Sequence, residues 1–490
     1  MRIRHLVHVV GLILLALTGA LVVTALVALI YGDGDAGAFA LTAGISLAVG
    51  AAAVATTDVE RDLTVREGYA VVALAWLAVG AVGALPFLFT GVLSSPVPAL
   101  FESISGFTTT GATVFADIEA LPHGILFWRN FTQWMGGMGI IVLGLAVLPF
   151  LGVGGMQLFQ AEVPGPTPSR LQPRITQTAK LLWYVYAGLT AAQAVLWMLG
   201  GASAFDAVTH AFTTLSTGGF SPEAESIAAF DSAYLQWVTI LFMFLAGVNF
   251  ALHYRALHSG PRAYWEDAEW RFFGKLLLGA GGLILAAVLA GGHFAGQGFE
   301  TSLRHSVFQT VSIVTTTGYV TADYEQWAIG AQVVLLLLMF VGGMAGSTGG
   351  GMKVVRVQVL VKHMFTEMKK SLRPRAVILT RVGRRVLQED VLLRIVAFLV
   401  LYLMVFAVGT MLLSFLGMDL TTAVGAAAAT LGNIGPGLGD VGAVDNYGWM
   451  GPTAQGLLTF LMVVGRLELF TVLLLFHPDL WRKSGVRSAG

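Results

Sequence analysis

The chain has 490 residues, of which 56% are hydrophobic and only 11% are charged, and its formal net charge at pH 7 is zero. Because soluble proteins carry charges on about a quarter of their residues, this composition excludes a soluble multidomain protein. It indicates a polytopic integral membrane protein, since apolar runs of spanning length recur along the whole chain. The sequence contains no cysteine, which excludes disulfides and thiolate metal sites.

Two apolar runs open the chain, at residues 6–31 and 38–55. The first follows a short basic start, but it is far longer than the apolar part of a signal peptide, and the second follows it at once. We therefore expect a retained pair of transmembrane helices within residues 1–56.

Four polar segments that contain glycine then recur at intervals of roughly 100 to 115 residues. Their sequences are SISGFTTTGATVF (103–115), AFTTLSTGGFSP (211–222), SIVTTTGYVTAD (312–323) and ATLGNIGPGLG (429–439). The alignment matches four glycines, namely Gly111, Gly218, Gly318 and Gly432. Each segment follows an apolar run too short to cross a bilayer, and spanning runs flank it on both sides.

This arrangement predicts four repeats of helix, re-entrant loop and helix that all enter from the same face of the membrane. The repeats are expected at residues 69–155, 180–256, 271–368 and 391–477, and only the third is expected to have a broken second helix. The predicted fold is an all-α polytopic membrane protein, with four parallel repeats of helix, pore loop and helix around a pseudo-fourfold pore and an added N-terminal helix pair.

The composition of the four loops indicates a cation site. Non-helical backbone is tolerated at membrane depth only where it is buried in protein or lines a water-filled path. Glycine reaches backbone angles closed to other residues, and threonine adds a hydroxyl oxygen on a stiff side chain. Rings of such oxygens can replace the hydration shell of a cation.

Basic residues are sorted to one side of the predicted topology. Of the 28 Lys and Arg, 25 fall in the segments on one side, and the positive-inside rule makes that side, with both termini, cytoplasmic. The opposite loops hold fifteen acidic residues. These acids either concentrate cations at an outer vestibule or reflect only the exclusion of basic residues from outer loops.

The motifs GFTTTGATVF, STGGFSP, TTTGY, GGMAGSTGGGMKVVR, ATLGNIGPG and VVGRLELFTVLLLF resemble the Trk/Ktr/HKT superfamily of potassium translocating subunits, in particular its TrkH branch. The resemblance implies a potassium pore formed by the four repeats of one chain. It also implies a homodimer in the bacterial inner membrane, associated with a cytosolic nucleotide-binding subunit of the TrkA type. Potassium would be the substrate, with no covalently bound cofactor and no nucleic-acid partner. An alkali-cation symporter coupled to sodium or protons on the same scaffold is the alternative.

Carried over by motif, the potassium filter comprises one group of residues from each repeat. The groups are Thr109, Thr110, Gly111 and Ala112; Ser216, Thr217, Gly218 and Gly219; Thr316, Thr317, Gly318 and Tyr319; and Thr430, Leu431, Gly432, Asn433 and Ile434. Because Leu431 stands where the other copies have threonine, we expect coordination that departs from exact fourfold symmetry. Because each copy is shorter than a TVGYG filter, we expect looser selectivity.

Residues 342–351 contain six glycines inside the expected second helix of the third repeat, each costing about 1 kcal/mol relative to alanine in a helix. A phosphate-binding loop, a seam for close helix packing and a flexible intramembrane loop are the three interpretations, and the resemblance favours the loop. With Arg466, which lies near the middle of the last apolar run, it would form a gate. The gate residues are Gly342, Gly343, Gly346, Ser347, Thr348, Gly349, Gly350, Gly351 and Arg466.

The largest cytoplasmic segment, residues 353–394, carries eleven basic residues. It is either a topology signal in contact with anionic lipid or a docking surface for the cytosolic subunit. A transporter of another fold is a rival class, but its commonest plans use inverted repeats. An enzyme is not expected, because the segment around Ser347 lacks the full nucleophile-elbow pattern.

Overall fold

The computed structural model describes residues 3–57, 65–146, 171–376, 378–383 and 385–481. The described elements are helices, apart from a two-residue antiparallel pair formed by β1 (Arg381–Val382) and β2 (Arg385–Val386). The predicted all-α class is confirmed.

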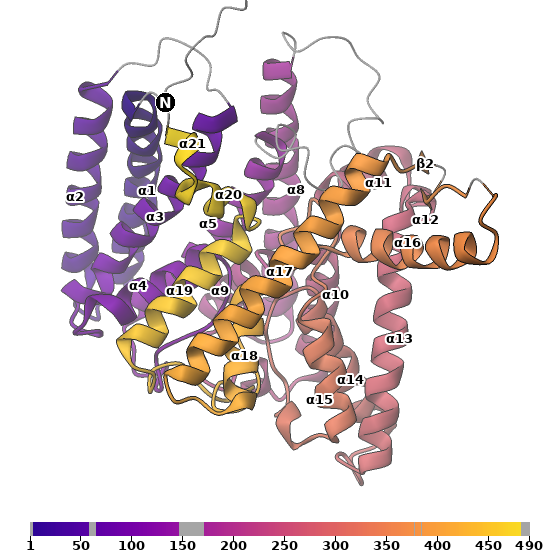
Figure 1. Cartoon of the computed structure of the whole chain (residues 1–490). Helices are drawn as coiled ribbons and strands as arrows, with labels where there is room; N and C mark the ends of the chain where they lie inside the picture. Colours follow the sequence, from indigo (N-terminus) through magenta and orange to yellow (C-terminus); the bar gives the residue numbers. More distant parts are fainter. Residues whose placement is uncertain (1–2, 58–64, 147–170, 377, 384, 482–490) are drawn as a thin grey trace, which may run out of the picture.

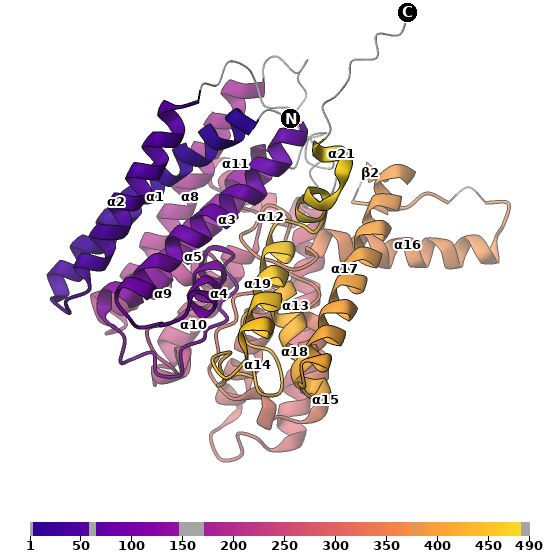
Figure 2. The ribbon, with the colours of Figure 1, turned by 60° about the vertical axis from the view of Figure 1, so that its left-hand side comes forward.

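The N-terminal pair consists of α1 (Ile3–Tyr31) and α2 (Ala36–Ala55), which lie side by side at one edge of the molecule (Figure 2). A Cβ built on Gly11 would lie 3.0 Å from the carbonyl oxygen of Gly50, so glycines allow the two backbones to approach closely. The Ser46 hydroxyl donates to the carbonyl of Leu14 at 2.8 Å. The predicted helix pair is therefore a packed unit of the fold.

The first two repeats follow the same plan of a long helix, a short helix and a second crossing segment. The first repeat contains α3 (Val65–Phe89), α4 (Pro96–Phe107) and α5 (His123–Ala146). The second contains α8 (Leu171–Leu199), α9 (Ala204–Leu215), η2 (Ser226–Ala229), α10 (Ala233–Gly247), α11 (Phe250–Ser259) and α12 (Arg262–Glu266).

The last two repeats keep this plan. The third contains α13 (Ala268–Gly291), α14 (Phe299–Val314), η3 (Tyr324–Gln326), α15 (Ile329–Leu338) and α16 (Val354–Leu372). The fourth contains α17 (Glu389–Phe415), α18 (Leu420–Leu431), α19 (Pro452–Arg466), α20 (Phe470–Leu473), η4 (Leu474–Phe476) and α21 (Pro478–Trp481).

The four short helices α4, α9, α14 and α18 lie at the same end of the molecule, in the lower half of Figure 1. The N-terminus, α21 and the β pair lie toward the opposite end, and α16 projects sideways from the bundle in both views (Figures 1 and 2). The short helices therefore enter from one face, as the parallel repeats predict.

Six of the described helices are long and apolar enough to cross a membrane, and two bent pairs bring the number to eight. The α10/α11 pair bends by 99°, and α19 bends by 113° from the segment formed by α20 and η4. The sequence predicted a break only in the third repeat, so the structure corrects this expectation for the second and fourth repeats. In the second repeat Val248 is extended, and the Asn249 side chain caps α11 by accepting from the amide of Ala251.

Candidate functional site

The four short helices end with the same backbone geometry. One cap residue follows the last turn of each helix. The backbone amide two residues after that cap donates back to a carbonyl of the helix at 2.8 Å. These donor and acceptor pairs are Thr110 and Ser105, Gly218 and Thr213, Thr317 and Ser312, and Ile434 and Ala429. The four loops therefore leave their helices in the same direction, although their sequences differ.

The residue two positions beyond each helix has a positive φ, and so does a glycine two positions later. The first set is Thr109 (51°), Thr217 (55°), Thr316 (62°) and Asn433 (55°), and the second is Gly111 (82°), Gly219 (78°), Gly318 (78°) and Gly435 (100°). Positive φ is uncommon outside glycine, so its recurrence fixes the register between the repeats. The glycines equivalent to Gly111 and Gly318 are Gly219 and Gly435, and the predicted matches Gly218 and Gly432 are wrong by one and three residues.

The four loops close into a ring. A Cβ built on each glycine of the second set would come within 3.0 Å of a carbonyl oxygen in the next repeat. The contacts run from Gly111 to Gly218, from Gly219 to Thr317, from Gly318 to Ile434 and from Gly435 to Thr110. Each loop therefore touches its successor, and the fourth touches the first. Real Cβ atoms do not approach an oxygen so closely, so each position requires glycine.

Four backbone oxygens at equivalent positions of the loops have no protein donor among the described residues. Thr109, Thr217, Thr316 and Asn433 are fully buried, and among the described residues no hydrogen bond reaches their carbonyl oxygens. Buried carbonyls are almost always paired with protein or water. The C-terminal ends of the four short helices, which carry partial negative charge, lie directly before these residues. A ring of unpaired oxygens at four negative helix ends suits a dehydrated cation.

The glycine-rich segment, residues 342–351, packs directly against this ring. The amide of Gly350 donates to the Thr316 hydroxyl at 2.6 Å, and the Thr348 hydroxyl donates to the carbonyl of Leu215 at 2.9 Å. A Cβ built on Gly350 would meet the carbonyl oxygen of Gly432. The segment therefore contacts the loops of three repeats. It is not helical, so close helix packing no longer explains its glycines, and Gly342, Gly346 and Gly351 have φ of 83°, 77° and 65°.

Arg466 completes this contact from the fourth repeat. It is the last residue of α19 and is 2% exposed, and its Nη1 donates to the carbonyl of Thr348 at 2.7 Å. The nearby Glu468 pairs with Arg356 at 2.6 Å and not with Arg466. Arg466 therefore places a positive charge at the glycine-rich segment, at the end of a helix and not in the middle of one.

A sequence model of the TrkH family, described as cation transport protein, matches residues 37–483. The chain belongs to this family. The Trk system potassium uptake protein TrkH of Salmonella typhimurium is 41% identical over 487 residues, which cover 99% of this chain and 100% of that protein. TrkG of Escherichia coli, also named a Trk system potassium uptake protein, is 34% identical over 484 residues, covering 98% of this chain and 99% of that one.

Among solved structures, the crystal structure of the potassium transporter TrkH from Vibrio parahaemolyticus matches with a TM-score of 0.91 and 39% sequence identity. The match covers 98% of this chain and 100% of that chain. These findings confirm the TrkH branch and the fold class that the sequence predicted. The relatives are transport proteins, in agreement with the expectation that the chain is not an enzyme.

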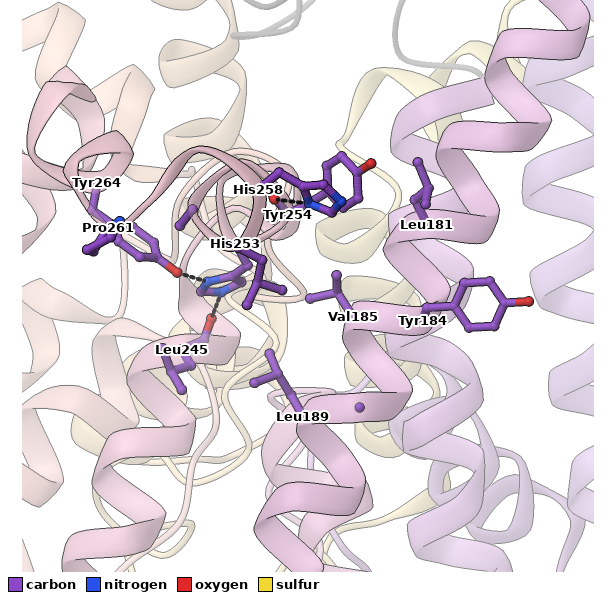
Figure 3. A pocket seen from close by; sticks show the side chains of 13 residues that line it. Leu181, Tyr184, Val185, Leu189, Leu245, His253, Tyr254, His258, Pro261 and Tyr264 are labelled. Atoms are coloured by element: carbon purple, nitrogen blue, oxygen red, sulfur yellow. Dashed lines mark hydrogen bonds between the residues drawn. The ribbon is translucent and has the colours of Figure 1, made fainter.

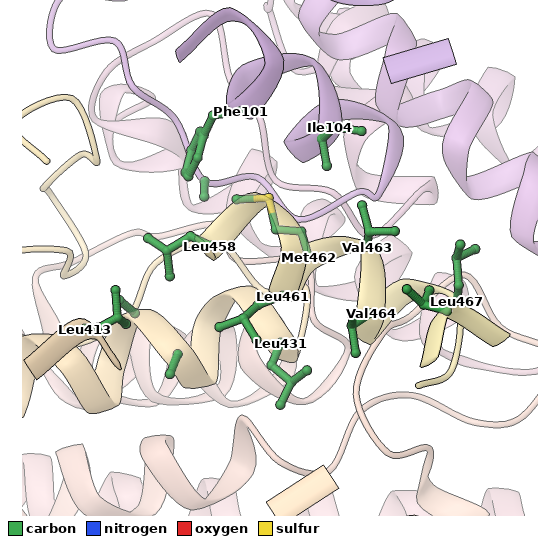
Figure 4. Packing of buried hydrophobic residues seen from close by; sticks show 14 of the residues in the cluster. Phe101, Ile104, Leu413, Leu431, Leu458, Leu461, Met462, Val463, Val464 and Leu467 are labelled. Atoms are coloured by element: carbon green, nitrogen blue, oxygen red, sulfur yellow. The ribbon is translucent and has the colours of Figure 1, made fainter. Parts of the chain in front are cut away.

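The structure separates Leu431 from the ring. Its side chain is fully buried in an apolar cluster with Leu461 and Met462 of α19 (Figure 4), so its predicted place among the filter side chains is wrong. Asn433 occupies the position of the threonines in the other loops. Its Nδ2 donates to the Thr110 hydroxyl at 3.0 Å and to the carbonyl of Met462 at 2.9 Å. An amide therefore replaces the fourth hydroxyl.

Leu431→Thr tests this assignment. Truncating a buried leucine and burying a hydroxyl in the same cluster should destabilise the protein by about 2 to 5 kcal/mol, seen as a lower unfolding temperature in detergent. Asn433→Thr, which restores the fourth threonine, should leave that temperature much closer to wild type. Improved cation selectivity in Leu431→Thr at unchanged stability would contradict the register derived from the backbone angles.

Two other predicted filter residues lie behind the ring. The Tyr319 side chain is buried, its hydroxyl contacts Thr213 and donates to the carbonyl of His210 at 3.2 Å, and its own carbonyl accepts from the Ser312 hydroxyl at 2.7 Å. Ala112 packs in the apolar cluster that contains α19. The Tyr319 carbonyl is therefore paired within its own loop, and the side chains of both residues pack behind the ring.

Sequence reasoning missed the residues that fasten the glycine-rich segment to the second repeat and to α13. The amide of Met344 donates to the carbonyl of Gly247 at 2.9 Å, and the carbonyl of Gly346 accepts from the amide of Phe250 at 3.1 Å. The Glu269 carboxylate accepts from the amide of Ala345 at 2.8 Å. The only sequence signal was the GVN interruption before Phe250, which a continuous apolar pattern obscured.

Acidic groups gather in the loops at the end where the short helices enter. Burial raises the pKa of Glu325, and the neighbouring Asp323 and Asp445 raise it further. Burial also raises the pKa of Glu223, with a further increase from Glu119. These carboxyls therefore take up protons at a higher pH than ordinary glutamates, so the negative charge of this face weakens as the pH falls.

A lateral cavity of about 680 Å³ lies between α8 and the α11/α12 segment, away from the ring. Figure 3 shows His253 at its wall, with one ring nitrogen 2.7 Å from the Tyr264 hydroxyl and the other 2.8 Å from the carbonyl of Leu245. The lining across from His253 is apolar, with Val185 and Leu189 of α8. None of the residues that line the cavity belongs to the ring of loops.

Proposed function

We propose that the chain is the potassium translocating subunit of a Trk-type uptake system and conducts potassium, and rubidium, through the ring of four loops. The closed ring of four glycine contacts carries this proposal, because it places four buried, unpaired backbone oxygens at equivalent positions. Relatives 34% and 41% identical over nearly the whole chain are named potassium uptake proteins.

The substrate follows from the ligands. Carbonyl and hydroxyl oxygens are neutral, so they favour a cation that loses its hydration shell at moderate cost, as potassium and rubidium do. Asn433 gives the fourth quarter of the ring an amide in place of a hydroxyl, which supports looser discrimination than in a filter with four identical quarters.

Conduction is gated by residues 342–351 with Arg466. In the present conformation the segment contacts the loops of three repeats, and the Arg466 charge lies where a cation leaving the ring would pass. A buried arginine opposes the approach of a second positive charge most strongly where water is scarce. Opening requires the segment to release its contacts, and its positive-φ glycines permit that change of backbone.

The assembly is a homodimer in the bacterial inner membrane, with both termini in the cytoplasm and a TrkA-type subunit that binds the nucleotide. The β pair, which contains Arg381 and Arg385, lies toward the end of the molecule that holds the N-terminus (Figure 1), in agreement with the positive-inside rule. We assign this surface as the docking site of the cytosolic subunit. Because α16 begins shortly after the glycine-rich segment, a movement of α16 on docking can displace that segment.

Tracer rubidium uptake into proteoliposomes tests the function. We expect uptake by the purified protein that external potassium competes with and external sodium does not, independent of pH and sodium gradients. Uptake that needs one of those gradients would favour the coupled symporter. Competition by sodium equal to that by potassium would refute the potassium filter.

A further inference from the structure

Behind the first loop lies a fully buried ion pair that the proposed conduction path does not use. Glu102 of α4 and Arg129 of α5 are both shielded from solvent, and Arg129 Nε lies 2.8 Å from Glu102 Oε1. A buried charge pair is expensive to desolvate and is often no more stable than apolar residues of the same size. Its position beside the ring therefore calls for a role besides stability.

The pair holds the chain segments that leave two adjacent loops. Glu102 Oε2 accepts from the amide of Val114 at 3.0 Å, and Arg129 Nη2 donates to the Thr113 hydroxyl at 3.1 Å. Arg129 Nη1 donates to the carbonyl of Ser221 at 3.2 Å in the second repeat. One ion pair thus fixes residues two and three positions after Gly111 and two positions after Gly219.

The second repeat adds a contact of its own from the equivalent place. The position six residues before the helix cap holds Glu102 in the first repeat, His210 in the second, Gln309 in the third and Ala426 in the fourth. His210 Nε2 lies 3.0 Å from the Ser221 hydroxyl. In the described structure the Gln309 amide has no hydrogen-bond partner, and alanine offers none. Among the described residues, fastening from this equivalent position is therefore seen in the first two repeats, whereas in the third repeat His305 of α14 lies 2.8 Å from the Thr321 hydroxyl.

We propose that Glu102 and Arg129 are positioning residues that set the width of the ring and so determine how strongly it discriminates potassium from sodium. The inference rests on the proposed potassium function. In the size-based account of ion selectivity, a filter rejects a cation smaller than potassium because its oxygens are kept from closing around that cation. The ion pair does this by tying the outgoing segments of two quarters to α4 and α5, which bury both partners.

The test compares Glu102→Gln with a double variant, Glu102→Leu with Arg129→Met. The single change keeps the shape but leaves a buried arginine unpaired, whereas the double change removes both charges and should fold normally. We expect both to lower the ratio of potassium to sodium permeability in proteoliposomes by about tenfold, which corresponds to about 1.4 kcal/mol. Unfolding temperature should fall in the single variant and recover in the double variant.

Glu300→Gln is the matched control. It also removes an acidic charge that is paired with an arginine, Arg304, but both residues lie on α14 and Glu300 is 56% exposed. It should keep the wild-type permeability ratio. A double variant that recovers both stability and selectivity would overturn the inference, since the pair would then be structural only. If the wild-type protein itself does not prefer potassium over sodium, the proposed function is refuted, and this result is distinguishable from a failure of the inference about Glu102 and Arg129.

Discussion

Replacing Gly318 by alanine will abolish selective potassium conduction. Gly318 has a φ of 78°, which costs an L side chain about 1 kcal/mol or more, and a Cβ there would overlap the carbonyl oxygen of Ile434 in the next repeat. The clash is with backbone, so it can be relieved only by moving a quarter of the ring. We expect at least a hundredfold loss of potassium over sodium preference, measured as permeability ratios in proteoliposomes.

The control for this change is Gly279→Ala on α13 of the same repeat. A Cβ at Gly279 meets nothing within 4 Å, and its φ is not positive, so this variant should fold, conduct and select as wild type does. Selectivity retained in a folded Gly318→Ala protein would show that the ring does not choose the ion.

Replacing Arg466 by alanine will raise potassium flux in the absence of any cytosolic subunit. The change removes a buried positive charge and the 2.7 Å hydrogen bond that holds the carbonyl of Thr348. Like charges repel strongly where water is scarce, and a barrier lower by about 1.4 kcal/mol raises flux about tenfold. Single-channel recording or tracer rubidium uptake at equal protein content gives the measurement.

Arg466→Lys separates charge from geometry. Lysine keeps the positive charge but lacks the planar fork of arginine, so flux should stay nearer to wild type than in the alanine variant. Flux through Arg466→Ala equal to that of wild type would remove Arg466 from the gate. The permeability ratio should be unchanged in both variants, because neither touches the ring.

The sequence was sufficient to predict the repeats and their common direction, because both follow from hydrophobic length and from recurring glycine motifs. It also matched Gly111 with Gly318, in agreement with their backbone angles, since TTTG occurs in both copies. It misplaced the other two glycines of the ring. STGG offers adjacent glycines and NIGPG offers two further ones, and only the backbone angle distinguishes which glycine meets the neighbouring loop.

Other features depend on contacts between distant segments. The bend after Gly247 lies inside an apolar run, and it is stabilised by hydrogen bonds to Met344 and Gly346 that no local pattern reveals. The sequence around Leu431 is apolar whether its side chain faces the pore or the protein core. Only its contacts with α19 show that it faces the core. The pairing of Glu102 with Arg129 joins residues on two different helices, and hydropathy reports each only as an isolated charge.

The ring is built from four unequal parts of one polypeptide, and this has a consequence for how it can vary. In a channel assembled from four identical chains, one codon change alters every quarter together, so only symmetric filters can arise. Here Thr109, Thr217, Thr316 and Asn433 are separate codons, and each can drift alone. Ion preference can therefore be adjusted in steps of one quarter, by inheritance or by design.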